Sequence, residues 1–381
     1  ATMSTTAPVQ RVTSTTGEPV WLGSGYAAAR ALLADPRLSR THPDPRHPAR
    51  MTQIGVFGGP IGDPAAEQGD HARLRRLLTK PFSARRMEAL RPKVELIAAD
   101  LLGALRDGGP PADFHALVSV PFPALVICEL LGVPLQERDD FRRWAAEATQ
   151  LQHPARSRAG LQSLWRYLGA LVERKRWAPG EDVVSELHAA QATDPGLTDD
   201  GIAHLAAGIL LAGHATVVSV IDRGVMLLVT NPGQREQLRT DPALMPPAVE
   251  EIIRFPSPLE GPQATRRGGL PRYAAADIAI EGVTIRTGDL VMFALQEADE
   301  DPGVFPHPGS FDVARADNPH LAFSHGLHFC IGAPLARMEL QVLFAGLLAR
   351  FPGLSLAVPL ARLKALPDRV PGAVAELPVS W

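Results

Sequence analysis

Cys330 and the residues around it form the part of the chain best suited to chemistry. The run from Phe323 to Gly332 reads Phe-Ser-His-Gly-Leu-His-Phe-Cys-Ile-Gly. Its two glycines, Gly326 and Gly332, remove side chains where the backbone would otherwise collide with a ligand. Pro334 suits the first turn of a helix, and the N–H groups at the start of that helix favour a thiolate over a thiol. The spacing therefore predicts a thiolate that can ligate a metal.

A cysteine at this position could serve as a core residue, a zinc ligand or a haem ligand. A buried cysteine is usually a small core hydrophobe, and this is our interpretation of Cys128, which lies in the apolar run Ala-Leu-Val-Ile-Cys-Glu-Leu-Leu. His325, His328 and Cys330 could bind zinc, but zinc needs four ligands and no second Cys/His pair accompanies them in the sequence. A haem iron needs one axial thiolate, and the loop favours that chemistry.

The elements that must position Cys330 are mostly helices. Apolar residues at helical spacing predict helices in the segments 74–78, 87–105, 161–176, 202–229, 247–255 and 335–351. Alternating apolar residues predict strands at 18–22, 277–280, 283–285 and 290–293, the second and third joined by a Glu-Gly turn. The pattern predicts a mainly α fold with a minor β portion.

Composition limits the classes of function. The 381 residues are enough for a large core, and no linker or repeat divides them, so we expect a single domain over 1–381. The net charge of −3 gives no case for nucleic-acid binding, and two cysteines exclude a disulfide framework.

Nothing in the sequence predicts secretion or a membrane anchor. Residues 1–10 have no apolar run and are expected to be disordered, with Ala1 and Thr2 an expression remnant before Met3. Charged and polar residues interrupt the apolar stretch 202–229, which predicts a core helix and no membrane span. A cytoplasmic protein is expected.

The loop around Cys330 resembles the haem-binding signature of the cytochrome P-450 family, Phe-x-x-Gly-x-His-x-Cys-x-Gly. Three further stretches match family patterns in the same order, so the resemblance runs from about residue 70 to the C-terminus. It implies a single-domain cytochrome P-450 fold, mainly α with a minor β portion, that encloses haem b. It also implies a haem-thiolate monooxygenase in which Cys330 is the axial ligand of the iron.

The same resemblance implies residues that hold the haem propionates. His71 and Arg75 match a His-x-x-x-Arg pattern one helical turn apart, and His328 matches the histidine two positions before the ligand. Arg266 matches a family arginine on a strand beside the haem, with a register uncertain by one position because Arg267 follows it. The propionates are carboxylates, so they need cations or hydrogen-bond donors as partners.

A further group is expected to support the structure. Glu251 and Arg254 match the family's Glu-x-x-Arg, and Arg315 ends the later stretch Phe-Asp-Val-Ala-Arg. A surface ion pair is the commoner outcome of a Glu-x-x-Arg spacing. The resemblance instead implies a buried Arg–Glu–Arg cluster that pins the segment leading to Cys330.

The central helix departs from the family pattern Ala-Gly-x-Asp/Glu-Thr, because Ala215 replaces the acid before Thr216. Thr216 is still expected to assist proton transfer to dioxygen and is the catalytic candidate. Water, a substrate group or His214 could replace the acid. The departure also leaves open oxidative coupling or ring closure, or a haem-binding protein without turnover. A protein without haem, in which Cys330 merely packs, is a further alternative.

Partners follow from what the chain lacks. No Gly-x-Gly-x-x-Gly fingerprint for a flavin or nicotinamide occurs, so electrons are expected from a ferredoxin-type donor with its reductase. Arg73, Arg76, Arg85 and Arg86 could dock such an acidic protein. The expected substrate is a small molecule, either free or bound to a carrier protein. The pocket that binds it is expected to be lined by residues in 51–61, 210–211 and 259–263 and around residue 372. We expect a natural-product intermediate and no nucleic-acid or membrane partner.

Overall fold

The chain forms two compact units. The computed structural model describes residues 7–14, 17–44, 46, 66–148, 154–259, 268–365 and 374–381. The first unit comprises Ala1–Arg76, Ile253–Pro256 and Gly261–Cys330. The second unit comprises Leu77–Ile252, Ser257–Glu260 and Ile331–Trp381. The single domain expected over 1–381 stays a prediction.

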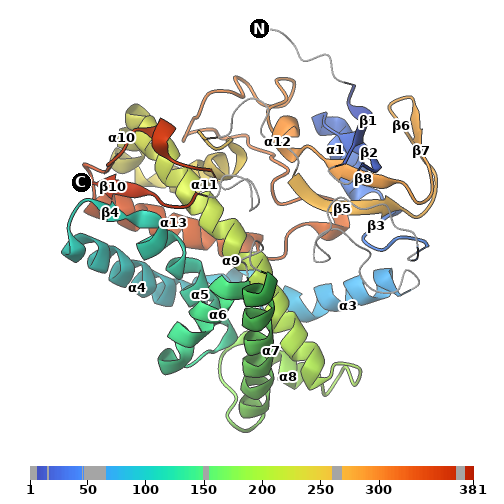
Figure 1. Ribbon diagram of the computed structural model, residues 1–381, viewed down its shortest axis with the longest axis horizontal. Coiled ribbons are helices and arrows are strands. Elements are labelled where there is room, and N and C mark those ends of the chain that lie inside the picture. Colours follow the sequence, from blue (N-terminus) through green and yellow to red (C-terminus); the bar gives the residue numbers. More distant parts are fainter. Residues whose placement is uncertain are drawn as a thin grey trace. The chain divides into compact units, whose positions relative to one another are not determined.

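A five-stranded sheet organises the first unit (Figure 1), in the order β1-β2-β8-β5-β3. Its strands are β1 (Val9–Thr13), β2 (Pro19–Gly23), β3 (Leu38–Ser39), β5 (Gly268–Ala274) and β8 (Leu290–Phe293). β2 and β8 are parallel, and the other pairs are antiparallel. The disorder expected for residues 1–10 does not extend to Val9 and Gln10, which begin β1.

Two shorter features complete the first unit. The strands β6 (Ile278–Ile280) and β7 (Val283–Ile285) form a hairpin as expected. Both residues of its turn, Glu281 and Gly282, have positive φ, which suits the twist of a two-residue hairpin. The helices are α1 (Tyr26–Ala34), α12 (Leu295–Ala298) and the 3₁₀ turn η4 (Gly326–His328). α1 contributes buried alanines and leucines to the apolar core that it shares with β5 and β8.

The second unit is helical. Its helices are α4 (Ala84–Gly108), η1 (His115–Ser119), α5 (Pro121–Leu131), η2 (Leu135–Glu137), α6 (Arg138–Ala148), α7 (Pro154–Trp177), α8 (Val183–Ala190), α9 (Asp199–Thr230), α10 (Pro232–Thr240), η3 (Pro242–Leu244), α13 (Ala333–Arg350) and η5 (Leu360–Arg362). A small sheet, in the order β4-β10-β9, pairs Ala112–Asp113, Pro378–Ser380 and Ser355–Leu356. Two helices contain residues of both units, α3 (Glu67–Thr79) and α11 (Met245–Arg254).

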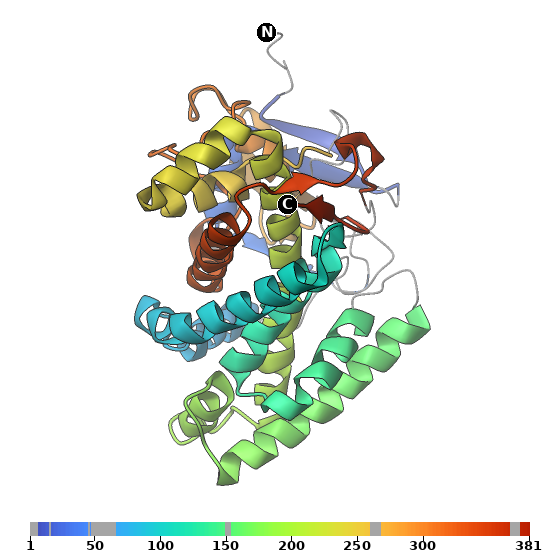
Figure 2. The ribbon, with the colours of Figure 1, turned by 90° about the vertical axis from the view of Figure 1, so that its left-hand side faces the viewer.

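The long helix α9 is the core element of the second unit. Thr198 caps it by accepting a hydrogen bond from the Gly201 N–H (3.1 Å), and Pro232 follows its end. α5, α7 and α8 pack against it (Figure 2). In the part of the chain that the structure describes, α9 is the one helix long and apolar enough to span a membrane. A buried core helix passes the same test, and the charged Asp222 is buried within α9.

Every helix and strand predicted from periodicity is confirmed, with ends that differ by up to three residues except for α3 and α7, which begin seven residues before the predicted start. Elements that were not predicted are α5, α6, β1 and β5, among others. α5 is apolar on nearly every face, so its sequence carries no helical periodicity.

Candidate active site

The loop that carries Cys330 is fixed by backbone hydrogen bonds. The Cys330 N–H donates to the carbonyl oxygen of Phe323 (2.8 Å), which closes the loop around η4. The side chain of Cys330 is half-buried, and α13 begins three residues later with Pro334 in its first turn. The expected placement of a cysteine just before a helix N-terminus is confirmed.

Gly326 is required by both conformation and space. Its φ is +70°, a region that other residues rarely adopt. A Cβ at this position would lie 2.8 Å from Ala34 Cα in α1. The loop therefore sits directly against α1, which no larger residue would permit.

Two histidines meet beside the loop. The rings of His71 in α3 and His328 in η4 are 4.3 Å apart. Burial and the neighbouring cation Arg272 lower the pKa of His328 to about 4, so its imidazole is neutral near pH 7. The pKa of His71 is also lowered, by burial and by Arg75. Arg75 donates to the carbonyl oxygen of Phe329 (2.8 Å), one residue before Cys330.

Arg272 is the cation that sequence reasoning missed. It lies on β5 and is 6% exposed, and burial together with Arg40 lowers its pKa to about 10. Arg266, the residue expected in this role, lies outside the described residues, so that expectation stays a prediction. The signal was available: Arg272 stands inside an otherwise apolar strand, immediately before the buried Tyr273.

This cluster has the character of an anion site. Arg272 is buried and Arg40 is half-buried, and this burial lowers the pKa of both guanidinium groups. Glu67 is the acid that opposes them, but its carboxylate accepts hydrogen bonds from the backbone N–H of Arg40 and of Thr41 (2.7 and 3.0 Å) and from the Ser39 hydroxyl. Buried cations in excess of acids stabilise a bound carboxylate or phosphate.

The three supporting residues are buried. Glu251 and Arg254 are 0% exposed and Arg315 is 8% exposed, so none belongs to a surface ion pair. Both arginines donate to backbone carbonyls of the segment that precedes the Cys330 loop: Asp299 and Pro308 for Arg254 (2.8 and 3.0 Å), Pro306 and Ser310 for Arg315 (2.8 and 3.1 Å). They hold the shape of that segment.

Thr216 lies on an open stripe of α9. Residues at a spacing of four, His204, Gly208, Ala212 and Thr216, are exposed, while the residues next to them are buried or half-buried. The Thr216 hydroxyl donates to the carbonyl oxygen of Ala212 (2.8 Å). The small residues along this stripe leave room for a small molecule against the helix.

His214, a substitute that the sequence offers for the missing acid, does not lie on this stripe. It is 6% exposed, and its Nε2 lies 3.0 Å from the carbonyl oxygen of Val120. Since a carbonyl only accepts, Nε2 carries the hydrogen. The ring therefore faces α5 and not Thr216, because residues two apart lie on opposite sides of a helix.

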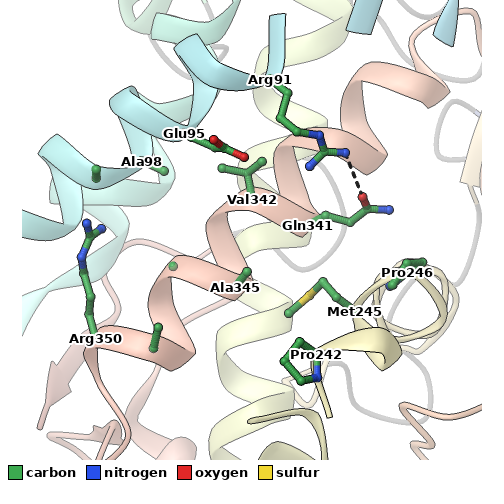
Figure 3. Close-up of a pocket in the computed structure, with 13 residues that line it drawn as sticks. Arg91, Glu95, Ala98, Pro242, Met245, Pro246, Gln341, Val342, Ala345 and Arg350 are labelled. Carbon is green, nitrogen blue, oxygen red and sulfur yellow. Dashed lines mark hydrogen bonds between the residues drawn. The ribbon is translucent and has the colours of Figure 1, made fainter. Parts of the chain in front are cut away.

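A separate groove of about 530 Å³ lies between α4, α11 and α13 in the second unit. Arg91 and Gln341 meet across it (Figure 3), and Arg350 lies at its far end. No candidate site residue lines it. The residue types therefore give it no place in the chemistry of Cys330.

Comparison with known proteins decides the family. The family model described as Cytochrome P-450 matches residues 244–355. The chain is 40% identical to pentalenolactone synthase of Streptomyces exfoliatus over 379 residues. The aligned part covers 98% of this chain and 93% of that protein. It is 39% identical over 388 residues to mycinamicin IV hydroxylase/epoxidase of Micromonospora griseorubida, covering 99% and 93%.

A solved structure agrees. The substrate-free cytochrome P-450 PimD, a polyene macrolide antibiotic pimaricin epoxidase, has a TM-score of 0.86 at 40% identity, covering 98% of this chain and 93% of that one. The chain belongs to the cytochrome P-450 family. The expected fold, mainly α with a minor β portion, is confirmed.

As a cytochrome P-450, the protein is a monooxygenase with haem b as its cofactor. It uses a small-molecule substrate and a separate redox partner. The residues present fit the cofactor, because the loop carries a half-buried thiol and its His328 lies near the cations Arg272 and Arg40. An axial thiolate and partners for two propionates are what this group requires.

Proposed function

We propose that this cytochrome P-450 oxidises a natural-product intermediate, free or attached to a carrier protein, in the cytoplasm of a bacterium. The observation that carries the proposal is the loop of Cys330, in which a half-buried thiol lies two residues after His328, a residue close to the cation Arg272. Relatives named for pentalenolactone, mycinamicin and pimaricin support the substrate class. The exposed small residues along α9 are consistent with a small organic substrate that binds against this helix.

Each candidate residue receives a role in this proposal. Cys330 ligates the iron. His71, Arg75 and His328 hold the propionates, together with Arg272 and, as the family resemblance implies, Arg266. Glu251, Arg254 and Arg315 brace the segment before the loop. When bound, haem supplies the activation of dioxygen, and a thiolate ligand promotes O–O cleavage.

Thr216 handles protons on the open side of α9. Its hydroxyl donates a hydrogen bond to the Ala212 carbonyl oxygen. By rotating away from that carbonyl, the hydroxyl can instead donate to a water on the open side of the helix. One oxygen atom enters the substrate, and the other leaves as water with two protons and two electrons. A ferredoxin-type protein with its reductase delivers the electrons.

Product mass tests the proposal. The haem-loaded protein is incubated with a surrogate ferredoxin, its reductase and a panel of natural-product intermediates, some attached to carrier protein. A product that gains one oxygen atom supports monooxygenation of that class. The departure at Ala215 leaves open one second candidate, oxidative coupling or ring closure, in which two hydrogen atoms from the substrate and two delivered protons and electrons reduce dioxygen to two waters. A product that loses two hydrogen atoms without gaining oxygen would support this candidate. Turnover of none of the panel, despite the carbon monoxide band of thiolate haem, would contradict the proposed substrate class.

A further inference from the structure

A closed circuit of hydrogen bonds leaves α9 and returns to it. Asp222 Oδ2 lies 2.7 Å from Nδ1 of His115 in η1. The His115 carbonyl accepts from the Val120 N–H (3.0 Å), and the Val120 carbonyl accepts from Nε2 of His214 (3.0 Å). The two ends of the circuit, His214 and Asp222, bracket Thr216 on α9.

The unusual backbone of η1 makes the circuit possible. Residues His115–Ser119 form a π-helical turn, and the bond from Val120 N–H to the His115 carbonyl is its five-residue hydrogen bond. π-Helical turns are rare and occur frequently at functional sites. Here the turn presents both a ring and a carbonyl to the same helix, α9.

Burial makes His115 the essential partner of Asp222. Asp222 is 0% exposed, so water does not solvate its carboxyl group. The His115 side chain is 12% exposed. Burial raises the pKa of Asp222, His115 and the Ser119 hydroxyl lower it, and Asp113 of β4 raises it further. Asp113 accepts from the His115 N–H (3.0 Å) and from the Leu377 N–H (2.8 Å), which fixes η1 from its other side.

We propose that His115 and Asp222 are positioning residues for Thr216, acting through Val120 and His214. Two anchored points eight residues apart fix both the rotation and the translation of α9 between them. Thr216 lies on this segment, on the open side, and its hydroxyl bonds to the Ala212 carbonyl of the same helix, so the two anchors hold that hydroxyl in one place relative to η1. The inference rests on the proposed role of Thr216 in proton transfer.

A double variant separates positioning from folding. In His115→Leu/Asp222→Leu, two apolar side chains replace the buried pair, an exchange that usually preserves stability. We expect an unchanged melting temperature, haem content and carbon monoxide band. The fraction of electrons recovered in product should fall roughly threefold or more. Amide hydrogen exchange across residues 212–222 of the haem-loaded protein should accelerate about tenfold.

Two further variants serve as controls. Asp222→Asn keeps an oxygen that accepts from His115 Nδ1–H, so coupling and exchange should both return close to the parent values. His188→Leu removes the ring of the more exposed His188–Asp199 pair (3.9 Å) near the start of α9. It should change neither measurement.

A Thr216→Ala background distinguishes the inference from the function on which it rests. If the pair acts through Thr216, the double variant lowers coupling in the parent and adds no further loss in Thr216→Ala. A further loss in that background would overturn the inference, as would parent-like coupling or exchange in the double variant. Full coupling in Thr216→Ala alone would instead overturn the role proposed for Thr216.

Discussion

The two cysteines show how the surroundings of a thiol decide its chemistry. Cys128 is buried in α5, where burial raises its pKa to about 12 and keeps the thiol protonated. Cys330 is half-buried, in a loop that ends at a helix N-terminus. The same residue type therefore serves as core filler in one place and as a ligand candidate in the other.

A pair of substitutions tests this difference. Cys330→Ser should abolish the red-shifted carbon monoxide band of reduced thiolate haem, because serine offers no thiolate. Cys128→Ser should leave that band intact. A band that survives Cys330→Ser would refute the ligand assignment.

Arg272 supports a second test at the scale of single residues. Arg272→Met should weaken haem retention, because a hydrogen bond to a charged group is worth about 1.5–3 kcal/mol. That corresponds to roughly ten- to hundredfold faster haem transfer to apomyoglobin. Arg37→Met removes an exposed arginine that pairs with Asp35 and should have no effect. Equal transfer rates for the two variants would contradict the role of Arg272 at the propionates.

Neighbouring glutamates on α11 allow a test at the scale of elements. Glu251 is fully buried, whereas Glu250 pairs with Arg337 of α13 at 2.7 Å with both side chains partly exposed. Truncating one member of a buried charge cluster costs about 3–5 kcal/mol, but an exposed pair contributes about 0–1 kcal/mol. Glu251→Ala should therefore yield mostly haem-free or insoluble protein, while Glu250→Ala remains soluble and loaded. Comparable haem content in both would show that Glu251 is not part of the brace.

α13 carries a buried acid that should make stability depend on pH. Glu339 is 1% exposed, and burial raises its pKa well above the ordinary value of 4.5. The folded chain therefore keeps a proton that the unfolded chain releases. The stability is highest at a pH below the ordinary pKa of 4.5, and it falls as the pH rises above that pKa. Glu339→Gln, neutral at every pH, should melt like the parent near pH ~4 and higher than the parent near pH ~8.

The control for this prediction has the opposite sign. Arg239 lowers the pKa of the exposed Glu236, so Glu236→Gln should give no gain at high pH. A Glu339→Gln variant that melts below the parent at high pH would mean that the carboxylate has a stabilising partner in the working enzyme.

Turnover is a property of the whole molecule, because electrons arrive from another protein and protons must reach a site on α9. Ala215 removes the acid next to Thr216, and His214 faces α5. With generic substrates we expect much of the reducing power to appear as peroxide. Ala215→Glu should raise the coupled fraction for small surrogates, although it can crowd the native substrate. The measurement is the amount of peroxide formed relative to product in both proteins. Tight coupling of electron use to product in the parent, with no gain in Ala215→Glu, would contradict the prediction.

The sequence alone predicted the local features of this protein. The Cys330 loop, the helices at 202–229 and 335–351 and the hairpin at 277–285 follow from motif and periodicity, which are properties of neighbouring residues. The family resemblance was sufficient to predict haem, a monooxygenase and the mainly α fold, all of which the comparisons confirm.

Only the tertiary structure could decide which distant residues meet. Arg272 joins His71 and His328 because β5 and α3 fold beside the loop, a meeting that the sequence did not reveal. The direction of the His214 ring and the pairing of His115 with Asp222 depend on η1 packing against α9, a contact between segments about a hundred residues apart. Periodicity reports which face of an element is buried, but the partner on the other side is chosen by packing, where shape and unsatisfied hydrogen bonds set the energy.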